Sequence, residues 1–138
     1  MSTSPADFNA QIIEEFRANE GRVGGRFEGT PLLLLHHTGA RSGKSYVNPL
    51  AYQADGGRYA IFASKAGAPE NPAWFHNLKA NPETTIEVGT ETLGVLAEEA
   101  SGAERDGLFA TQKQRIPQFA EYEKTAGRTI PVIVLTPR

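Results

Sequence analysis

Apolar residues recur along the chain with a period that is helical at first and extended afterwards. Near the N-terminus Phe8, Ile12 and Phe16 recur every four positions, and charged residues occupy the opposite face. This spacing predicts an amphipathic helix within residues 1–21, with Ser4 as its N-cap. Its apolar stripe is expected to dock on the body of the domain. Peripheral contact with a membrane surface is the second interpretation, which the acidic polar face disfavours.

Extended patterns begin after a glycine-rich stretch, residues 21–31, that has no period and is either a linker or a flap over a site. The apolar run that follows is expected to be a strand buried on both faces. The Asp55-Gly56 pair marks a hairpin. Strands are predicted at 32–37, 46–53, 58–64, 84–88, 92–97 and 130–136, and further helices at 71–80 (with Asn71 as cap), 101–114 (with a capping box from Ser101 to Glu104) and 118–125.

About six strands, joined mostly by hairpins, predict a mainly β fold with helices, of the α+β class. The expected architecture is a split antiparallel β-barrel formed by residues 22–138, in a single domain that the N-terminal helix precedes. The mouth of such a barrel is a natural place for a ligand. If the first three strands form a meander, Ser64 and Lys65 return to the end where the first strand delivers the chain.

Composition narrows the classes of function. The 138 residues carry a formal net charge of −2 and no cysteine, which argues against a nucleic-acid partner and excludes thiolate nucleophiles, thiolate metal sites and disulfides. Basic residues nevertheless outnumber acidic ones in residues 36–79, which suits a small anionic ligand. With no apolar leader and no run of membrane-spanning length, the expected location is the cytoplasm.

A basic turn follows the first predicted strand. Gly39, Arg41, Gly43 and Lys44 combine small residues with cationic side chains, as an anion cradle requires. The end of the turn imitates a phosphate-binding P-loop. However, Thr38 stands where the first glycine of that motif belongs, and a β-branched and aromatic segment follows where a helix is needed. We therefore reject nucleotide hydrolysis and keep the anion cradle.

The three histidines do not form a recognisable catalytic or metal site. His36 and His37 are adjacent and so face opposite sides of a strand, and His76 has no carboxylate at helical spacing. Each is expected to be a partly buried, hydrogen-bonded side chain, and no metal is expected. An anion cradle, flat aromatic side chains and no evident nucleophile indicate chemistry that belongs to a bound cofactor.

Several spans together make the pattern more specific. In order and spacing, the sequence resembles the deazaflavin-dependent nitroreductase family of actinobacteria from Arg22 onward. The spans that carry the resemblance are Leu32–Leu50 (with Thr38-Gly39-Ala40-Arg41-Ser42-Gly43 and Val47-Asn48-Pro49-Leu50), Ala63–Gly67, Asn71–Leu78, Ala80–Pro82 and Arg128–Val132.

The resemblance implies a barrel related to FMN-binding barrels that holds the 5-deazaflavin coenzyme F-420. It places the phosphate and polyglutamate tail at the basic turn and near the end of the third strand, and it places the ring system beside the Val-Asn-Pro-Leu strand. Many relatives carry basic residues where this chain has Ala40 and Tyr46, and Lys44 is the candidate to compensate. The implied cofactor-binding residues are Arg41, Ser42, Gly43, Lys44, Tyr46, Asn48, Pro49, Leu50, Ala63, Ser64, Lys65, Trp74 and Asn77.

The activity that the resemblance implies is hydride transfer from the reduced deazaflavin to a quinone, an enone or a nitroheterocycle. Tyr122 maps onto a substrate-facing tyrosine and could donate a proton, because phenols carry their proton at neutral pH. Two alternatives stay open: an FMN-dependent oxidoreductase on the same barrel, and a carrier that binds the deazaflavin without turnover. The chain is expected to be a monomer or a homodimer.

Overall fold

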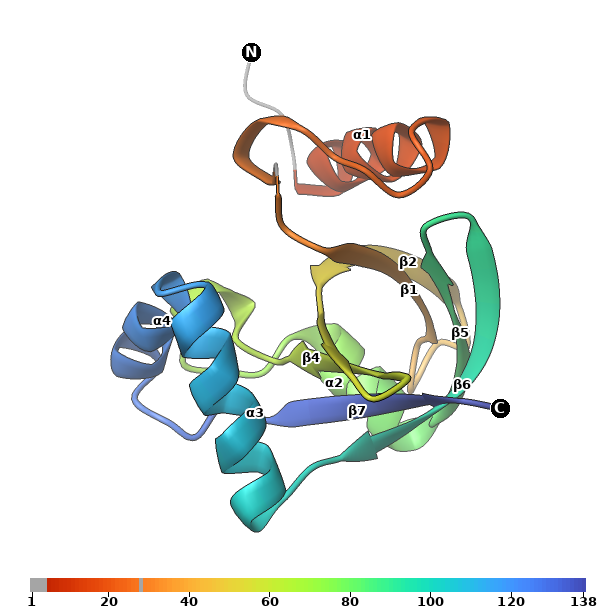
Figure 1. Ribbon diagram of the computed structural model, residues 1–138. Coiled ribbons are helices and arrows are strands. Elements are labelled where there is room, and N and C mark those ends of the chain that lie inside the picture. The colour runs from red at the N-terminus through yellow and green to blue at the C-terminus, as the bar shows by residue number, and fades with distance from the viewer. Residues whose placement is uncertain (1–4, 28) are drawn as a thin grey trace.

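The structure is a computed structural model that describes residues 5–27 and 29–138 (Figure 1), so the predicted cap Ser4 lies outside it. Most predicted elements are present, within a few residues of their expected ends. The helices and strands are α1 (Pro5–Ala18), η1 (Gly25–Phe27), β1 (Leu32–Thr38), β2 (Ser45–Ala51), β3 (Gln53–Asp55), β4 (Arg58–Phe62), η2 (Lys65–Gly67), α2 (Ala73–Ala80), β5 (Glu83–Val88), β6 (Glu91–Glu99), α3 (Gly102–Arg115), α4 (Gln118–Ala126) and β7 (Val132–Pro137).

One antiparallel sheet contains all seven strands, in the order β2-β1-β5-β6-β7-β4-β3. The segment predicted as a single strand, 46–53, is divided at Tyr52: its first part pairs with β1, and the strand after it pairs with β4. The two ends of the sheet order are therefore consecutive in the chain, so the sheet curls into the expected split barrel. The meander is present only in part: β1 pairs with β2 and β3 pairs with β4, but β2 and β4 are not hydrogen-bonded neighbours in the sheet.

The turn between β3 and β4 shows how the sequence sets a hairpin. Asp55 pairs with Arg58, and the two residues between them, Gly56 and Gly57, have φ of 56° and 88°. A two-residue hairpin turn of this kind needs positive φ at both central positions, which glycine adopts without a steric cost. The hairpin is as predicted.

β1 is buried on both faces, as its apolar run predicted. Leu33 and Leu35 point into the barrel core, whereas Leu32 and Leu34 belong to a second cluster beneath α1. All four are at most 5% exposed. The outer face of an ordinary barrel strand meets water, so the run Leu32–Leu35 can be apolar on both faces only because α1 covers the outer one.

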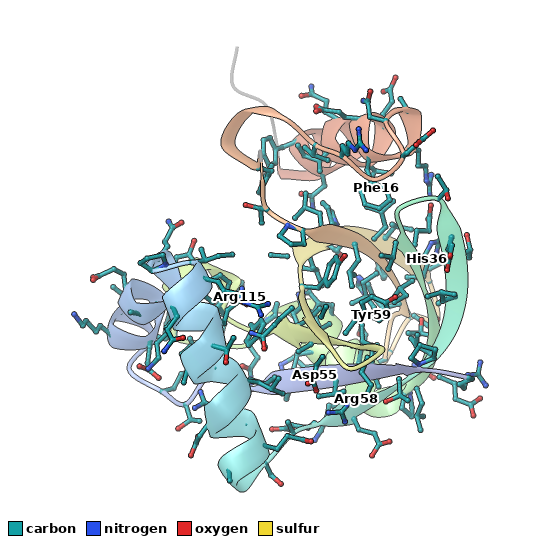
Figure 2. The ribbon with its side chains drawn as sticks, in the orientation of Figure 1. Phe16, His36, Asp55, Arg58, Tyr59 and Arg115 are labelled. Carbon is teal, nitrogen blue, oxygen red and sulfur yellow. The ribbon has the colours of Figure 1, made fainter. Side chains whose placement is uncertain are left out.

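The stripe of α1 supplies that cover. Ile12 and Phe16 are buried against Leu32 and Leu34, and Figure 2 shows Phe16 pointing from the helix towards the strands beneath it. The expected docking on the barrel is confirmed. These apolar side chains are occupied by packing, so the interpretation of peripheral membrane contact gains no support.

The last two helices cover another part of the sheet. Phe62 of β4 meets Phe109 of α3 and Phe119 of α4 in edge-to-face contacts, with ring centroids 6.0 and 5.6 Å apart. Such aromatic contacts add to the free energy of burial. Figure 1 shows α1 above the barrel and α3 and α4 to the left of it. The two groups of helices thus leave part of the β2 and β4 region uncovered between them.

Two predicted caps are wrong. α3 begins after Ser101 as expected, but the Ser101 side chain makes no cap hydrogen bond, and Glu104 instead lies within 3.4 Å of Arg58. At α2 the N-cap is Pro72 rather than Asn71. The Asn71 side chain accepts a hydrogen bond from Arg128 instead, because a charged donor competes well with backbone N–H groups.

Candidate functional site

Two cavities adjoin beside the uncovered strands. The first, of about 840 Å³, is formed mainly by the 39–44 turn, β2 and α2. The second, of about 790 Å³, is formed by β2, α4 and parts of α1 and η1. A further hollow, of about 1020 Å³, lies between the C-terminal end of α1 and the glycine-rich stretch that follows it. The first two form a continuous candidate site, because both are lined by Asn48, Lys65, Pro72 and Trp74.

The basic turn is compact and attached to α2. The N–H group of Gly39 donates to the carbonyl oxygen of Lys44 at 2.8 Å, and that of Gly43 donates to Gly39 at 3.0 Å. A Cβ atom at position 39 would collide with the hydroxyl oxygen of Ser42, so a larger residue there would require the Ser42 side chain to move. The N–H group of Ala40 donates to Asn77 Oδ1 at 2.9 Å. The turn is therefore held in one place relative to the helix.

Two cations from separate segments line the first cavity. Arg41 comes from the basic turn, and Lys65 comes from η2, where its φ of 46° lies in the left-handed region. Lys65 Nζ also lies 2.9 Å from Glu70 Oε1, and this lysine lowers the pKa of the Glu70 carboxyl. Arg41 has no ion pair within residues 5–27 and 29–138. The two cations that the sequence expected to converge do share one cavity.

The second cavity has aromatic walls. Tyr122 packs edge-to-face on Phe119, with ring centroids 5.3 Å apart, and both line the cavity together with Trp74 and Phe62. Phe27 of η1 forms part of the opposite wall, so the glycine-rich stretch contributes to the site. The cavity lies between α1 and α4, since Asn9 of α1 and Gln118 of α4 also line it. Such walls suit a flat, uncharged molecule.

His37 was expected only to be a partly buried, hydrogen-bonded side chain, which is confirmed, yet it lies in the wall of the first cavity. The same expectation is wrong for His76, which is exposed and makes no side-chain hydrogen bond within residues 5–27 and 29–138. The Nε2 atom of His37 lies 2.6 Å from Asn48 Oδ1, and its Nδ1 atom lies 2.9 Å from Asn77 Nδ2. The Tyr46 ring stacks on it at 5.5 Å. Burial lowers the pKa of His37, against the opposing effect of the bond to Asn48.

His36 faces the other way, as the alternation of a strand requires. Its Nε2 atom lies 2.7 Å from Glu87 Oε2 of β5, and Figure 2 shows it beside that strand. Glu87 also receives two bonds from Arg17 of α1, at 3.1 and 2.7 Å. This second network ties α1 to the barrel and takes no part in either cavity.

Arg128 is a site-organising residue to which sequence reasoning gave no role. Its guanidinium donates to the carbonyl oxygens of Ala63, Ala68 and Glu70, at 3.1, 3.2 and 2.9 Å, and to the Asn71 side chain. The planar fork of an arginine suits several acceptors at once. These bonds hold the segment that carries Ser64 and Lys65. Its place in the Arg128–Val132 span was the one available signal.

The structure separates the residues implied by the resemblance into three groups. Arg41, Ser42, Tyr46, Asn48, Lys65, Trp74 and Asn77 line the first cavity, and Pro49, Leu50, Ser64 and Tyr122 line the second. Gly43, Lys44 and Ala63 line neither cavity. Gly43, with φ of 72°, closes the turn, and the Lys44 side chain is exposed. Ala63 is fully buried, and its carbonyl oxygen binds Arg128.

Two kinds of feature are absent from the part of the chain that the structure describes. Among the residues that the structure describes, no three His, Asp or Glu side chains gather closely enough to hold a metal ion. No helix in the described part of the chain has the length and apolar character needed to cross a membrane.

Comparison with known proteins gives consistent results. The family model described as F420H(2)-dependent quinone reductase matches residues 10–137. An F420H(2)-dependent quinone reductase of Mycobacterium tuberculosis is 40% identical over 127 residues, which cover 89% of this chain and 85% of the relative.

Two solved structures are similar as well. A structure described as an F420-H2 dependent reductase has a TM-score of 0.70 and 38% identity, covering 76% of this chain and 93% of that one. A structure described as a domain-swapped dimer has a TM-score of 0.72 and 34% identity, covering 96% and 99%. The chain therefore belongs to the F420H(2)-dependent quinone reductase family.

Proposed function

We propose that this protein reduces quinones with hydride from reduced coenzyme F-420. Membership of the family supports the cofactor and the class of reaction. The observation that carries the proposal is the adjoining pair of cavities, one with two cations and one with aromatic walls, which share Asn48, Lys65 and Trp74. This arrangement can hold an anionic group and a flat ring system side by side.

The residues present fit the deazaflavin. Arg41 and Lys65 can pair with a phosphate or a carboxylate of the acidic tail from two directions, since a guanidinium and an ammonium both donate charge-assisted hydrogen bonds. Ser42 adds a hydroxyl donor in the same cavity. Trp74 and the Pro49-Leu50 segment offer flat apolar surfaces for the ring system where the cavities meet. The first cavity offers the acidic tail one cation fewer than the sequence predicted, because Lys44 does not line it.

The bound coenzyme would supply the hydride, and the chain would supply position, a dry environment and a proton. Phe62, Phe119 and Trp74 exclude water from the second cavity and restrict an acceptor to a flat orientation. Tyr122, in the same wall, can donate its phenolic proton to the quinone oxygen that gains charge. One hydride and one proton convert a quinone into a hydroquinone, so the reaction balances.

A binding experiment tests the cofactor. The protein is produced in a host that makes F-420, and the visible spectrum of the released ligand is recorded. Binding of added F-420 and FMN is then followed through Trp74, the single tryptophan. We expect F-420 to bind more tightly, because a bare phosphate uses fewer cations than an acidic tail. Tighter binding of FMN would instead support the FMN-dependent alternative.

A turnover experiment tests the reaction. Oxidation of reduced F-420 is followed with a short-chain quinone, an enone and a nitroheterocycle. We expect the quinone to be reduced fastest, because the aromatic walls of the second cavity suit a flat ring, and Tyr122 in the same wall can donate a proton to its carbonyl oxygen. Tight F-420 binding with no turnover of any acceptor would support the carrier alternative.

We further propose that the protein works in the cytoplasm as a monomer or homodimer. The solved relative described as a domain-swapped dimer makes a dimer the first state to test, by light scattering during size-exclusion chromatography. To test the location, cells of a native host are separated into soluble and membrane fractions, and the protein is detected in each fraction with an antibody. Recovery with the membrane fraction would contradict it and would revive the interpretation of membrane contact through α1.

A further inference from the structure

A continuous series of hydrogen bonds runs from the basic turn to the junction of the two cavities. The N–H group of Ala40 lies 2.9 Å from Asn77 Oδ1, and Asn77 Nδ2 lies 2.9 Å from His37 Nδ1. His37 Nε2 lies 2.6 Å from Asn48 Oδ1. His37 and Asn77 are 5% and 8% exposed, so the bond between them is shielded from water.

The direction of every bond in this series follows from its first member. A backbone N–H group can only donate, so Asn77 Oδ1 accepts and Asn77 Nδ2 must be a donor. His37 Nδ1 then has to accept, which requires a lone pair on that atom. The remaining nitrogen, Nε2, therefore carries the proton and donates to Asn48 Oδ1. The histidine is neutral, in a single tautomer.

The consequence reaches the site through Asn48. Because its Oδ1 atom is engaged by His37, its Nδ2 group is directed elsewhere. Nδ2 donates to no residue within 5–27 and 29–138, and it is not enclosed either, since the single enclosed polar side-chain atom without a partner among those residues is Gln112 Nε2. Asn48 lines both cavities. An unpaired donor thus stands where they meet.

We propose that His37 is a positioning residue whose neutral form orients Asn48 Nδ2 to donate a hydrogen bond to a carbonyl oxygen of the bound ligand. The carbonyl belongs either to the coenzyme ring or to the quinone acceptor, since both present such oxygens. This inference rests on the proposed function for the identity of the ligand. The orientation of Asn48 rests on the hydrogen bonds alone.

A second proton on His37 would break the series. Nδ1 would become a donor facing Asn77 Nδ2, which is also a donor. Rotating the Asn77 amide would remove that conflict, but it would place Nδ2 against the N–H group of Ala40. Protonation therefore loosens the turn that carries Arg41.

The charges around His37 oppose protonation as well. Arg41, Lys65 and His76 line the same cavity from the turn, η2 and α2, and its described lining contains no carboxylate. His36 is adjacent on β1, and the nearest acid on that side, Glu87 of β5, binds His36 on the opposite face. Tyr46 of β2 stacks on the ring and brings no carboxylate to it. Together with burial, these groups favour the neutral form.

The first experiment reads the tautomer directly and does not depend on activity. The imidazole ¹⁵N shifts of the labelled, cofactor-free protein are recorded between pH 5 and 8. We expect the His37 signals of a neutral ring protonated at Nε2 at pH 7, persisting below the pH at which free histidine becomes charged. A proton on Nδ1, or a charged ring at pH 7, would overturn the proposal whatever the enzyme reduces.

The second experiment measures the donor. Removal of one hydrogen bond that is worth about 1–1.5 kcal/mol weakens binding roughly tenfold. In Asn48→Ala we expect a rise of that size in the Kd of F-420 if the carbonyl belongs to the coenzyme, or in the KM of the quinone if it belongs to the acceptor. Asn48→Asp keeps an acceptor for His37 and removes the donor, but it also adds a negative charge beside an anionic coenzyme, so it should show at least the same loss. Unchanged values in both variants would overturn the proposal.

The third experiment separates positioning from packing. His37→Gln offers an acceptor and a donor that do not titrate, whereas His37→Leu offers neither. We expect Gln to recover a substantial part of the F-420 affinity that Leu loses, and to abolish the weakening of wild-type binding at low pH. The matched control is His36→Gln, on the opposite face, which should keep the wild-type pH profile. Equal losses in Gln and Leu would reduce His37 to a packing residue.

Discussion

Arg128 donates through Nη2 to the carbonyl oxygen of Ala63 at a distance of 3.1 Å, across 65 positions of the chain. The same guanidinium reaches Ala68 and Glu70. These acceptors lie on both sides of Lys65, so the position of that cation depends on a residue that does not itself line either cavity.

Replacement of Arg128 should affect both stability and binding. A lysine cannot reproduce the planar fork, so Arg128→Lys leaves several part-buried acceptors unpaired and should cost about 2–3 kcal/mol in the free energy of unfolding. We also expect weaker F-420 binding, because Lys65 loses its support. Urea unfolding and Trp74 fluorescence measure the two effects.

Arg105 provides the matched control for that variant. It donates through two nitrogens to the carbonyl oxygen of Ile130, at 3.2 and 2.8 Å, but lies away from the site. Arg105→Lys should lower stability and leave F-420 affinity near the wild-type value. Equal effects of the two variants on affinity would show that Arg128 acts only through general stability.

The three lysine and arginine side chains that were expected to bind the coenzyme tail should differ in their effect on its affinity. Arg41→Ala and Lys65→Ala each remove a charge from the first cavity and should weaken F-420 binding by about tenfold, equivalent to about 1.4 kcal/mol. The loss should shrink at high salt. Lys44→Ala, in the same turn but outside the cavity, should have little effect. A larger loss in the Lys44 variant would mean that the tail follows the outside of the turn.

Tyr122 should matter for the rate rather than for binding of the coenzyme. Tyr122→Phe keeps the aromatic wall and removes the proton donor, so kcat for quinone reduction should fall by about 10²-fold while the Kd of F-420 stays similar. Tyr52→Phe is a suitable control, because Tyr52 packs on Tyr59 and lines neither cavity. An unchanged kcat in the Tyr122 variant would assign the proton to water.

The network that ties α1 to β5 should depend on pH. The bonds from Arg17 are the largest cause that lowers the pKa of the Glu87 carboxyl, and His36 contributes as well. A carboxyl with a lowered pKa stabilises the fold above its ordinary value of 4.5, and that stabilisation is lost as the pH falls through the folded-state pKa.

Glu87→Gln should therefore lower the Tm at pH 7, by about 2–4 °C if the partly exposed network is worth about 1 kcal/mol. The difference from wild type should disappear towards pH 3. Thermal unfolding at several pH values measures it. A difference that stays constant over this range would show that packing, rather than charge, explains the effect.

Sequence reasoning succeeded where structure is decided locally. The helical spacing of Phe8, Ile12 and Phe16 and the glycines of the β3–β4 turn act through neighbours in the chain, so their elements appear as predicted. The basic turn was recognised by its residue types. That Arg41 and Lys65 share a cavity was expected from the meander, whose hairpins are also local features.

The tertiary structure alone decided which polar groups meet. The role of His37 could not be predicted from the sequence, because its partner Asn77 stands 40 positions away. In the same way, Asn71 binds Arg128, 57 positions away, instead of capping α2. Periodicity records which face of an element is buried, since burial depends on spacing along the chain. The partner of a buried donor depends on where distant segments come to lie, and only the closed barrel determines that.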